Sequence, residues 1–344
     1  MEPSRWSAAG STDLLEICTQ SMGRLEGHPA VRAQRAIARP AQILQQLNPR
    51  ARKNVAHHYD LSDVLYDQFL DWDRQYTCAY FSDPRMTLEE AQQAKKHHVA
   101  SKLLLRPGHK VLEIGSGWGG LALHLADAEH VDVTGITGSA QQLAVARRRA
   151  LEAELSRRVS FHLRDFHEEA GRYDRVVSVG LLEQVGAPHY DAFFQKIHDV
   201  LAEDGVAVVH AIGRMTAPAP TNPWLAKYIF PGAHIPSLSE VLPAVEKAGL
   251  WVTDVEVLRL HYAETLRHWR KRFVANWDRV AEHYDTRFCR MWEFYLALSE
   301  AGFRRGSLMV FQLQLAKRAD AVPLTRDYLY ERAASSAFQV ELAA

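Results

Sequence analysis

The sequence predicts an α/β protein with a mostly parallel β-sheet that is covered by helices on both faces. Between residues 110 and 211, short apolar segments of strand length alternate with longer segments of helical period. A glycine-rich turn, VLEIGSGWGG at 111–120, joins the first strand of this alternation to its first helix. At 344 residues, the chain can bury one large core and a smaller appended region.

Residues 1–55 are expected to form an extension ahead of the main domain. The segment from Leu14 to Met22 carries apolar residues at helical spacing, and a basic stretch punctuated by prolines follows as far as Lys53. We interpret this region as a helical, basic extension that docks on the main domain or on a partner. A further helix is predicted at 86–105, which is rich in helix-forming residues and stops at the following Arg-Pro-Gly.

The main domain is expected to span 56–320. Strands are predicted near 110–114, 131–136, 158–163, 174–179 and 205–211, and helices near 118–128, 139–154 and 189–200. There follow a proline-rich insertion at about 213–237, a helix near 238–248, a strand near 251–259, two helical segments, a final strand within 307–318 and a C-terminal tail, 321–344. The sheet would then have seven strands. An insertion after the carboxyl end of a strand lies where such sheets bind ligands, so we expect it to form a lid over the substrate.

Composition excludes several classes of protein. Lysine plus arginine and aspartate plus glutamate both number 41, so the net charge is zero and gives no general attraction to nucleic acid. No apolar run approaches the roughly 20 residues of a membrane-spanning helix, and the N-terminus lacks the apolar core of a signal peptide. Three scattered cysteines indicate neither a disulfide framework nor a CxxC metal site. The histidine pairs at 57–58 and 97–98 lack a third ligand, so no metal is predicted. From the membrane, signal-peptide and cysteine observations together, a cytoplasmic protein is expected.

The glycine-rich turn predicts a cofactor site at the carboxyl end of the first strand. Glycines let the backbone approach a ligand closely enough for its N–H groups to donate hydrogen bonds. A dinucleotide site would show GxGxxG and an acid about 20 residues later. Here the pattern is GxGxGG, and the second strand ends VTGITGSAQQ without an acid. Glu113, two residues before the first glycine, is instead common in enzymes that use S-adenosylmethionine (SAM).

The order of three motifs strengthens the prediction of a SAM site. VLEIGSGWGG follows the first strand, GITGSAQQ follows the second, and Asp165 and Phe166 follow the third. In this fold these three positions contact the methionine, ribose and adenine parts of SAM. The sequence therefore predicts a Rossmann-like class I SAM-dependent methyltransferase.

Residues 54–318 resemble the cyclopropane-fatty-acyl-phospholipid synthase family, which includes the mycolic acid cyclopropane synthases. The resemblance is carried by HHYDLSDVLYDQFLD, QYTCAYF, LEIGSGWGG, GITGSAQQ, SVGLLEQVG, HAIG, NPWLAKYIFPG and HYAETLRHW. It implies transfer of a methylene group from SAM to the cis double bond of an unsaturated acyl chain in a phospholipid, which forms a cyclopropane ring. Such a substrate also implies peripheral contact with the inner membrane surface.

The resemblance further implies a bound bicarbonate ion as general base. A cation forms on the alkylated chain and must lose a proton before the ring closes. By motif, the bicarbonate cage falls on Cys78, Glu183, His210, the backbone amide of Ile212, and Tyr262. On physical grounds, we expect Glu183 to accept a hydrogen bond from the bicarbonate hydroxyl and the histidine, tyrosine and amide to donate.

The same resemblance assigns residues to the SAM site and to the substrate pocket. For SAM it indicates Tyr76, Thr77, Gly115, Gly117, Thr137, Gln142 and Phe166, to which the motif order adds Glu113 and Asp165. Aromatic faces suit both a sulfonium ion and a carbocation, so Tyr59, Trp224 and Tyr228 are expected to line the substrate pocket. Core packing is an equally good interpretation of Tyr228.

Several alternatives stay open at this point. Gln184 stands where the family usually has histidine, and this difference keeps open a methyl-branched or methylene product. Small-molecule N-methylation and a catalytically silent lipid-binding protein are disfavoured by the complete cage. The basic segment 266–277 is either a helix that binds anionic lipid or one with a buried apolar face and a solvated charged face. A homodimer is a further open expectation.

Overall fold

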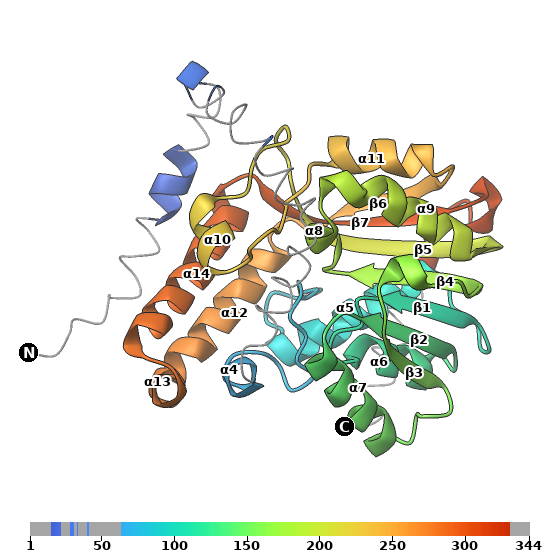
Figure 1. The fold of residues 1–344 in the computed structure, drawn as a ribbon, viewed down its shortest axis with the longest axis horizontal. Coiled ribbons are helices and arrows are strands. Elements are labelled where there is room, and N and C mark those ends of the chain that lie inside the picture. The colour runs from blue at the N-terminus through green and yellow to red at the C-terminus, as the bar shows by residue number, and fades with distance from the viewer. Residues whose placement is uncertain (1–14, 22–27, 31–32, 34–39, 41–62, 331–344) are drawn as a thin grey trace, which may run out of the picture.

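The computed structural model describes residues 15–21, 28–30, 33, 40 and 63–330 (Figure 1). At its centre lies a seven-stranded sheet with the order β3-β2-β1-β4-β5-β7-β6. The strands are β1 (Lys110–Ile114), β2 (Asp132–Thr137), β3 (Val159–Leu163), β4 (Tyr173–Val179), β5 (Leu201–Arg214), β6 (Trp251–Val257) and β7 (Leu308–Ala316). Strand β7 pairs antiparallel with β5 and β6, and the remaining pairs are parallel. The predicted fold class is confirmed.

Helices cover both faces of the sheet (Figure 1). One face packs against α5 (Leu88–Leu103), α6 (Gly120–Ala128) and α7 (Ala140–Glu152). The other packs against α8 (Leu182–Val185), α9 (Tyr190–Val200) and α11 (Leu238–Lys247). Alternation along β5 explains this division, because Val208 belongs to the first core and its neighbours Ala207 and Val209 to the second.

Local sequence determines where the helices begin and end. Thr87 caps α5 in a capping box with Glu90, and Leu104 takes a left-handed conformation at its end, ahead of Pro107 and Gly108. Ser139 caps α7 by accepting a hydrogen bond from the backbone N–H of Gln142. These signals lie in the sequence, so the predicted bounds of the helices hold to within a few residues.

A group of helices lies beside the sheet and carries a large aromatic core (Figure 1). It comprises α4 (Asp63–Asp67), α10 (Pro223–Tyr228), α12 (His261–Ala275), α13 (Trp277–His283) and α14 (Thr286–Arg305). Where two helical segments were predicted between β6 and β7, the structure has three. The difference arises because α12 ends at Asn276 and Asp285 starts a new helix by capping the N–H of Phe288 at 2.6 Å.

The basic segment 266–277 lies in α12 as far as Ala275, and this helix has a buried apolar face. Trp269 and Phe273 are fully buried. Three of its basic side chains pair with carboxylates of this chain: Arg267 with Glu264 (2.7 Å), Arg270 with Glu300 (3.3 Å) and Arg272 with Glu89 (2.6 Å). Because their charges are matched within the protein, this helix is a poor candidate for a surface that attracts anionic lipid.

The predicted extension, 1–55, lies mostly outside the described residues. Its described helical piece, 15–21, contacts the main domain through Glu16, which pairs with Arg304 (3.6 Å) and Arg305 (3.0 Å) on α14. At the other end, the Tyr328 hydroxyl donates to the Gln314 side chain at 3.1 Å, so part of the predicted tail packs on the sheet. Within the described ranges, the helices are too short or too polar to cross a bilayer.

Candidate active site

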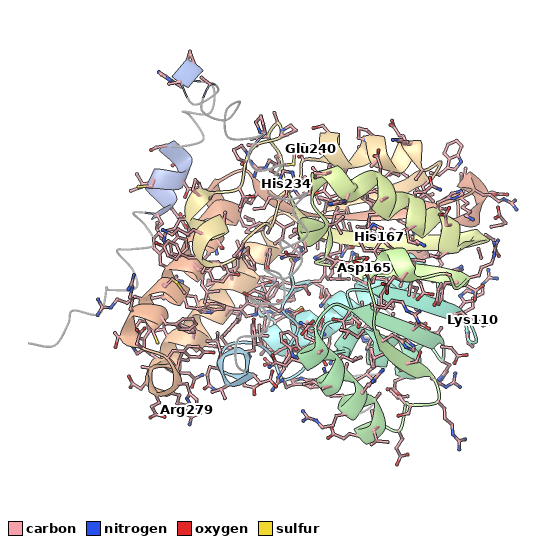
Figure 2. All side chains as sticks on the ribbon, in the orientation of Figure 1. Lys110, Asp165, His167, His234, Glu240 and Arg279 are labelled. Carbon is pink, nitrogen blue, oxygen red and sulfur yellow. The ribbon has the colours of Figure 1, made fainter. Side chains whose placement is uncertain are left out.

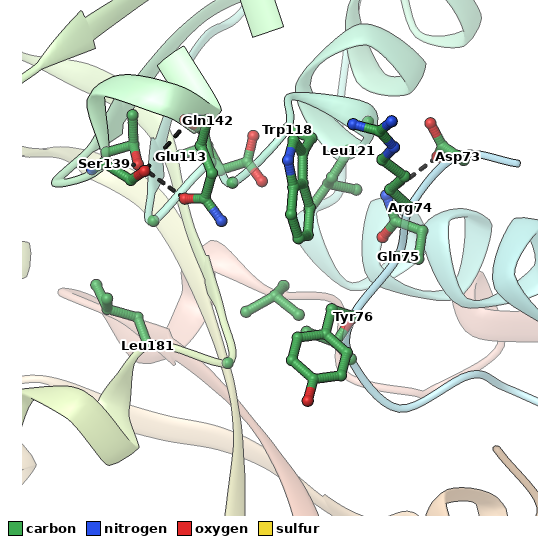
Figure 3. Close-up of a pocket in the computed structure, with 18 of the residues that line it drawn as sticks. Asp73, Arg74, Gln75, Tyr76, Glu113, Trp118, Leu121, Ser139, Gln142 and Leu181 are labelled. Carbon is green, nitrogen blue, oxygen red and sulfur yellow. Dashed lines mark hydrogen bonds between the residues drawn. The ribbon is translucent and has the colours of Figure 1, made fainter. Parts of the chain in front are cut away.

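A cavity opens at the carboxyl ends of β1, β2 and β4 (Figure 3). The strand order reverses at β1, because β2 and β3 follow on one side of it and β4 and β5 on the other. A crevice forms at such a switch point of a parallel sheet. We call this crevice the cofactor cavity. Its walls include seven of the nine residues predicted to contact SAM: Tyr76, Thr77, Glu113, Gly115, Gly117, Thr137 and Gln142.

The glycine turn exposes its backbone to the cofactor cavity. Gly115 and Gly117 have φ values of +88° and +51°, in the left-handed region that favours glycine. A Cβ added at Gly117 would meet no atom within 4 Å, so the turn faces open space there. At Gly115 it would meet Leu181 at 3.2 Å. Side chains at either position would therefore strain the turn, and at Gly117 one would also fill the cavity.

Glu113 brings an unpaired carboxylate oxygen to this cavity. The side chain is buried, and its Oε2 has no hydrogen-bond partner among the described residues. Burial raises its pKa to about 8, although the positive charge of Lys95 acts in the opposite direction. A buried carboxylate of this kind suits a cationic ligand group, such as the ammonium of SAM. The residues present therefore fit the predicted cofactor.

The end of β2 and the first turn of α7 supply a hydrogen-bonded pair to the same wall. The Thr137 hydroxyl lies 3.2 Å from the Gln142 side-chain oxygen and donates to it. Ser139 caps the following helix and fixes the start of α7. This pair keeps the Gln142 amide beside the cavity, where it can meet hydroxyl groups of a ligand.

A second cavity adjoins the first and shares Tyr76, Thr77, Gly180 and Gln184 with it. It lies between the end of β5, the insertion that follows β5, α12 and α14, and we call it the apolar cavity. Much of its wall is apolar: Leu225, Phe230, Ala233, Ile235, Leu266, Phe303 and Leu308. The structure brings all five predicted cage residues to this one cavity: Cys78, Glu183, His210, Ile212 and Tyr262.

Two members of the predicted cage are bonded to each other. The backbone N–H of Ile212 donates to Oε1 of Glu183 at 2.5 Å, whereas we expected this amide to donate to bicarbonate. The short helix α8 places Glu183 beside the end of β5, where its carboxylate accepts the hydrogen bond of the Ile212 amide in place of bicarbonate. Oε2 of Glu183 is buried without a partner among the described residues, and burial raises its pKa to about 7. One carboxylate oxygen is thus left for a ligand.

Two other cage residues, His210 and Cys78, are neutral near pH 7. Burial, together with the nearby charge of Lys95, lowers the pKa of His210 to about 3. Burial raises the pKa of the Cys78 thiol, and this thiol donates to the carbonyl oxygen of Ala79 at 3.3 Å. Tyr262 reaches the cavity from α12. An anion in this cavity would meet neutral hydrogen-bond donors rather than a formal positive charge.

Aromatic rings close the junction between the two cavities. The hydroxyls of Tyr76 and Tyr295 lie 3.0 Å apart, and the Tyr76 ring packs 5.2 Å from Trp269 and 5.5 Å from Tyr66. Tyr295 lines the apolar cavity from α14 and was not predicted as a site residue. Its spacing along the helix is that of a core residue, and no signal in the sequence distinguishes it from one.

Four other predicted site residues do not reach these cavities. Asp165 and His167 lie near each other (Figure 2), where Asp165 caps the 3-10 helix Phe166–Glu168 and accepts from the backbone N–H of His167 at 3.0 Å. The Phe166 ring stacks on His167. Trp224 and Tyr228 do not line the apolar cavity: Trp224 is partly buried against the aromatic core, and Tyr228 is 45% exposed. Leu225 lines the cavity in their place, since adjacent helical residues point about 100° apart. Tyr59 lies outside the described residues.

Lys95 is a buried cation of the cofactor cavity that sequence reasoning missed. Its ammonium donates to the side-chain oxygen of Gln75 and, at 3.0 Å, to the Thr77 hydroxyl. Burial lowers its pKa to about 8. The sequence did contain a signal that Lys95 is buried, because it lies four residues from Ala91 and from Val99 on the buried stripe of α5.

The histidine pair at 97–98 is divided between two environments. The His97 ring packs edge-on against His124 at 4.6 Å, and His98 Nε2 lies 2.6 Å from the Glu256 carboxylate. In the part of the chain that the structure describes, no three histidine, cysteine, aspartate or glutamate side chains come together as metal ligands.

Comparison with known proteins identifies the family. A family model described as mycolic acid cyclopropane synthetase matches residues 46–313. Tuberculostearic acid methyltransferase UfaA1 of Mycobacterium tuberculosis is 40% identical over 281 residues, or 78% of this chain. Cyclopropane-fatty-acyl-phospholipid synthase of Escherichia coli K12 is 36% identical over 260 residues, or 76% of this chain. The match spans only 66% of the length of each relative.

A solved structure supports the same assignment. The mycolic acid cyclopropane synthase CmaA1, in complex with SAH and CTAB, is 33% identical and superposes with a TM-score of 0.74, covering 78% of this chain and 99% of that one. The family model, the relatives and this structure all match the domain that holds the two cavities. The chain therefore belongs to the mycolic acid cyclopropane synthetase family and has the fold of the SAM-dependent methyltransferases.

Proposed function

We propose that this protein transfers a methylene group from SAM to the cis double bond of an unsaturated acyl chain in a phospholipid, forming a cyclopropane ring, with bicarbonate as general base. The junction of the two cavities is the observation that carries this proposal. One cavity has the glycine turn and Glu113, and the other has apolar walls around a cluster of polar groups. The name of the Escherichia coli relative supports a lipid substrate, because it refers to a fatty-acyl phospholipid.

In this proposal, SAM supplies the methyl group that is transferred. Glu113 holds its ammonium, and the backbone at Gly115 and Gly117 lies against its methionine part. Thr137 and Gln142 meet its ribose. Tyr76, which belongs to both cavities, offers its ring to the cationic charge at the junction.

The apolar cavity has two tasks. Its hydrocarbon walls accommodate the acyl chain and exclude water, which would otherwise quench a cation. Bicarbonate, when bound, supplies the base. Glu183 holds it through the free Oε2, while His210 and Tyr262 donate hydrogen bonds and Cys78, whose thiol donates to Ala79, lines the same cavity. Donors fixed before the reaction need no rearrangement when charge develops.

A turnover assay tests the proposal. The full chain is incubated with SAM and vesicles of a phospholipid that carries one cis double bond per acyl chain. We expect SAM-dependent gain of one CH2 group by mass spectrometry and cyclopropane proton signals by NMR of the extracted lipid. Vesicles of a fully saturated phospholipid serve as the control. Consumption of SAM without any change in the unsaturated lipid would contradict the proposal.

A second candidate is C-methylation without ring closure. Gln184 lies at the junction of both cavities, where it cannot carry charge near neutral pH, and UfaA1 is named as a methyltransferase of tuberculostearic acid. In this case the cation would be quenched in another way, and the product would be methyl-branched or would carry a methylene group. The NMR spectrum of the same lipid extract decides between ring and branch.

Peripheral membrane contact is also part of the proposal, and an aromatic rim beside the apolar cavity is our candidate for it. The rim consists of Trp224, Lys227 and Tyr228 on α10 and Phe294 on α14. Tyr228 and Phe294 are 45% and 40% exposed, and the Trp224 ring lies 5.6 Å and 4.8 Å from theirs. The Lys227 ammonium lies 5.0 Å above the Tyr228 ring. Aromatic rings with a neighbouring cation suit the interface of a bilayer.

Sedimentation with vesicles tests the rim. We expect Tyr228→Ser combined with Phe294→Ser to weaken binding to anionic phospholipid vesicles roughly tenfold or more, since two apolar rings no longer leave water. Trp251→Ser is the matched control, because Trp251 is an exposed aromatic residue on the edge strand β6. Equal loss of binding in the control, or none in the double variant, would rule out the rim as the contact.

A further inference from the structure

His210 and Gln312 face each other across neighbouring strands. They are directly paired in the antiparallel ladder of β5 and β7. Both are buried, with exposed fractions of 2% and 1%, and the Gln312 side-chain nitrogen lies 3.0 Å from Nδ1 of His210. His210 lines the apolar cavity, whereas Gln312 lies outside its lining. Gln312 therefore contacts the imidazole from behind.

This contact decides which ring nitrogen carries the hydrogen. A neutral imidazole has one N–H donor and one acceptor nitrogen. The Gln312 amide donates to Nδ1, so the hydrogen must lie on Nε2. Nε2 is then the ring nitrogen that can donate a hydrogen bond to a ligand in the cavity. The opposite tautomer would present a lone pair, which repels an anion.

The charges around His210 keep its ring neutral. Lys95, His98 and Lys102 approach from α5, and Glu256 approaches from β6. Glu256 is itself engaged, because His98 lies 2.6 Å from its carboxylate and Lys102 lies 2.5 Å from it. Burial and the positive charges of the lysines disfavour an imidazolium, and the pKa of His210 falls to about 3. The imidazole therefore acts through its tautomer rather than through a charge.

A glutamine is chemically distinctive at this position. Glu256, Gln312 and His210 form one row across β6, β7 and β5. A carboxylate at 312 could only accept a hydrogen bond, so it would draw the hydrogen to Nδ1. Oε1 of Gln312 has no hydrogen-bond partner among the described residues, so the contact with His210 is the one described polar contact of this amide.

We propose that Gln312 is a positioning residue that holds His210 as the Nε2–H tautomer, so that the imidazole presents a hydrogen-bond donor to an anion in the apolar cavity. The identity of this anion as bicarbonate rests on the proposed function. The tautomer does not, because it follows from the contact between the two side chains. The two parts can therefore be tested separately.

NMR of the full chain with 15N-labelled histidine tests the tautomer. The His210 signals are assigned by their loss in His210→Gln, and long-range proton–nitrogen correlations show which nitrogen is protonated. We expect Nε2–H in the wild type and Nδ1–H in Gln312→Glu. Gln312→Met, which loses the donor but introduces no charge, should no longer hold a single tautomer. A wild-type spectrum with Nδ1–H would overturn the proposal.

Gln314 provides a matched control on the same strand. It is also buried, and it bonds Thr253, Tyr328 and the carbonyl oxygen of Lys102 rather than His210. We expect Gln314→Met to leave the His210 tautomer unchanged, even if it lowers stability as much as Gln312→Met does. A tautomer shift of equal size in both variants would assign the effect to general packing and would contradict a specific role for Gln312.

Bicarbonate added to CO2-depleted protein tests the anion. We expect it to shift the His210 Nε2 signal in the wild type and not in Gln312→Glu. Turnover of Gln312→Glu should fall about 10- to 100-fold, by analogy with groups that orient a metal-bound histidine, with the KM for SAM unchanged. A wild type that holds Nε2–H but ignores bicarbonate would refute the proposed base and leave the tautomer in place. A rise in the KM for SAM alone would contradict the role of Gln312.

Discussion

Glu183→Gln is expected to remove transfer to the lipid and to leave SAM binding intact. The glutamine keeps an oxygen that can accept from the Ile212 N–H, but it lacks the carboxylate that accepts the proton of bicarbonate. Loss of a proton-transfer partner lowers turnover by roughly 10²- to 10⁴-fold. We would measure turnover on unsaturated vesicles and SAM affinity by calorimetry. Glu152→Gln, at an exposed glutamate of α7, is the control.

The same substitution is expected to stabilise the protein at high pH. The pKa of Glu183 is raised from 4.5 to about 7 in the folded state, so its favourable contribution is present below 4.5 and is lost as pH rises through 7. Above that pH the wild type keeps a desolvated charge that glutamine avoids. The gain should be on the order of 3 kcal/mol at pH 8 and nearly absent at pH 4.5.

Urea unfolding at these two pH values checks the gain in stability. An equal gain at both values would contradict the buried carboxylate as its cause. Loss of SAM affinity in Glu183→Gln would contradict its assignment to the apolar cavity. Together, the two measurements separate a functional role from a structural one, because a merely structural glutamate would not combine higher stability with lost turnover.

Glu113→Gln is expected to weaken SAM binding about 10- to 100-fold, because a hydrogen bond between a carboxylate and an ammonium contributes about 1.5–3 kcal/mol. Burial raises the pKa of Glu113 to about 8, so in the free protein the carboxyl is mostly protonated at pH 6. Binding of the ammonium would then release a proton. Affinity of the wild type should therefore rise about tenfold between pH 6 and pH 7.

Calorimetry in buffers of different ionisation enthalpy measures both the affinity and the proton release. Glu113→Gln should show a flat affinity between pH 6 and 7 and no release of a proton from this site. Glu152→Gln again serves as the control and should follow the wild type. A wild type with a flat profile over this range would show that Glu113 does not pair with the ammonium of SAM.

The fold could be predicted because its signals are local. Apolar segments of strand length mark β1 to β4 to within two residues, and the glycine turn marks the crossing point of the sheet. Strand β5 shows the limit of such signals. It continues to Arg214, beyond the predicted end at 211, because β7 pairs with it as far as Leu308. The length of a strand depends on its partner, and the partner lies about a hundred residues away in the sequence.

The site was harder to predict where it depends on the direction in which a side chain points from its helix. The NPWLAKYIFPG motif contributes Leu225 and Phe230 to the wall of the apolar cavity, whereas Trp224 and Tyr228 were expected to line a substrate pocket. A shift of one residue turns a side chain by about 100° around a helix. From the sequence, the basic residues of α12 were compatible with binding to anionic lipid. Only the structure shows that Glu89 and Glu300, from distant segments, pair with them.

The sequence by itself determined the alternation of strands and helices, the glycine turn with Glu113, and the residue types of the cage. Only the tertiary structure decided that the Ile212 amide bonds Glu183, that Lys95 lies buried beside Thr77, and that Gln312 meets His210. The physical reason is the range of the forces involved. Secondary structure follows from contacts a few residues apart, whereas hydrogen-bond partners and desolvation depend on which distant segments the sheet register and the helix faces bring together.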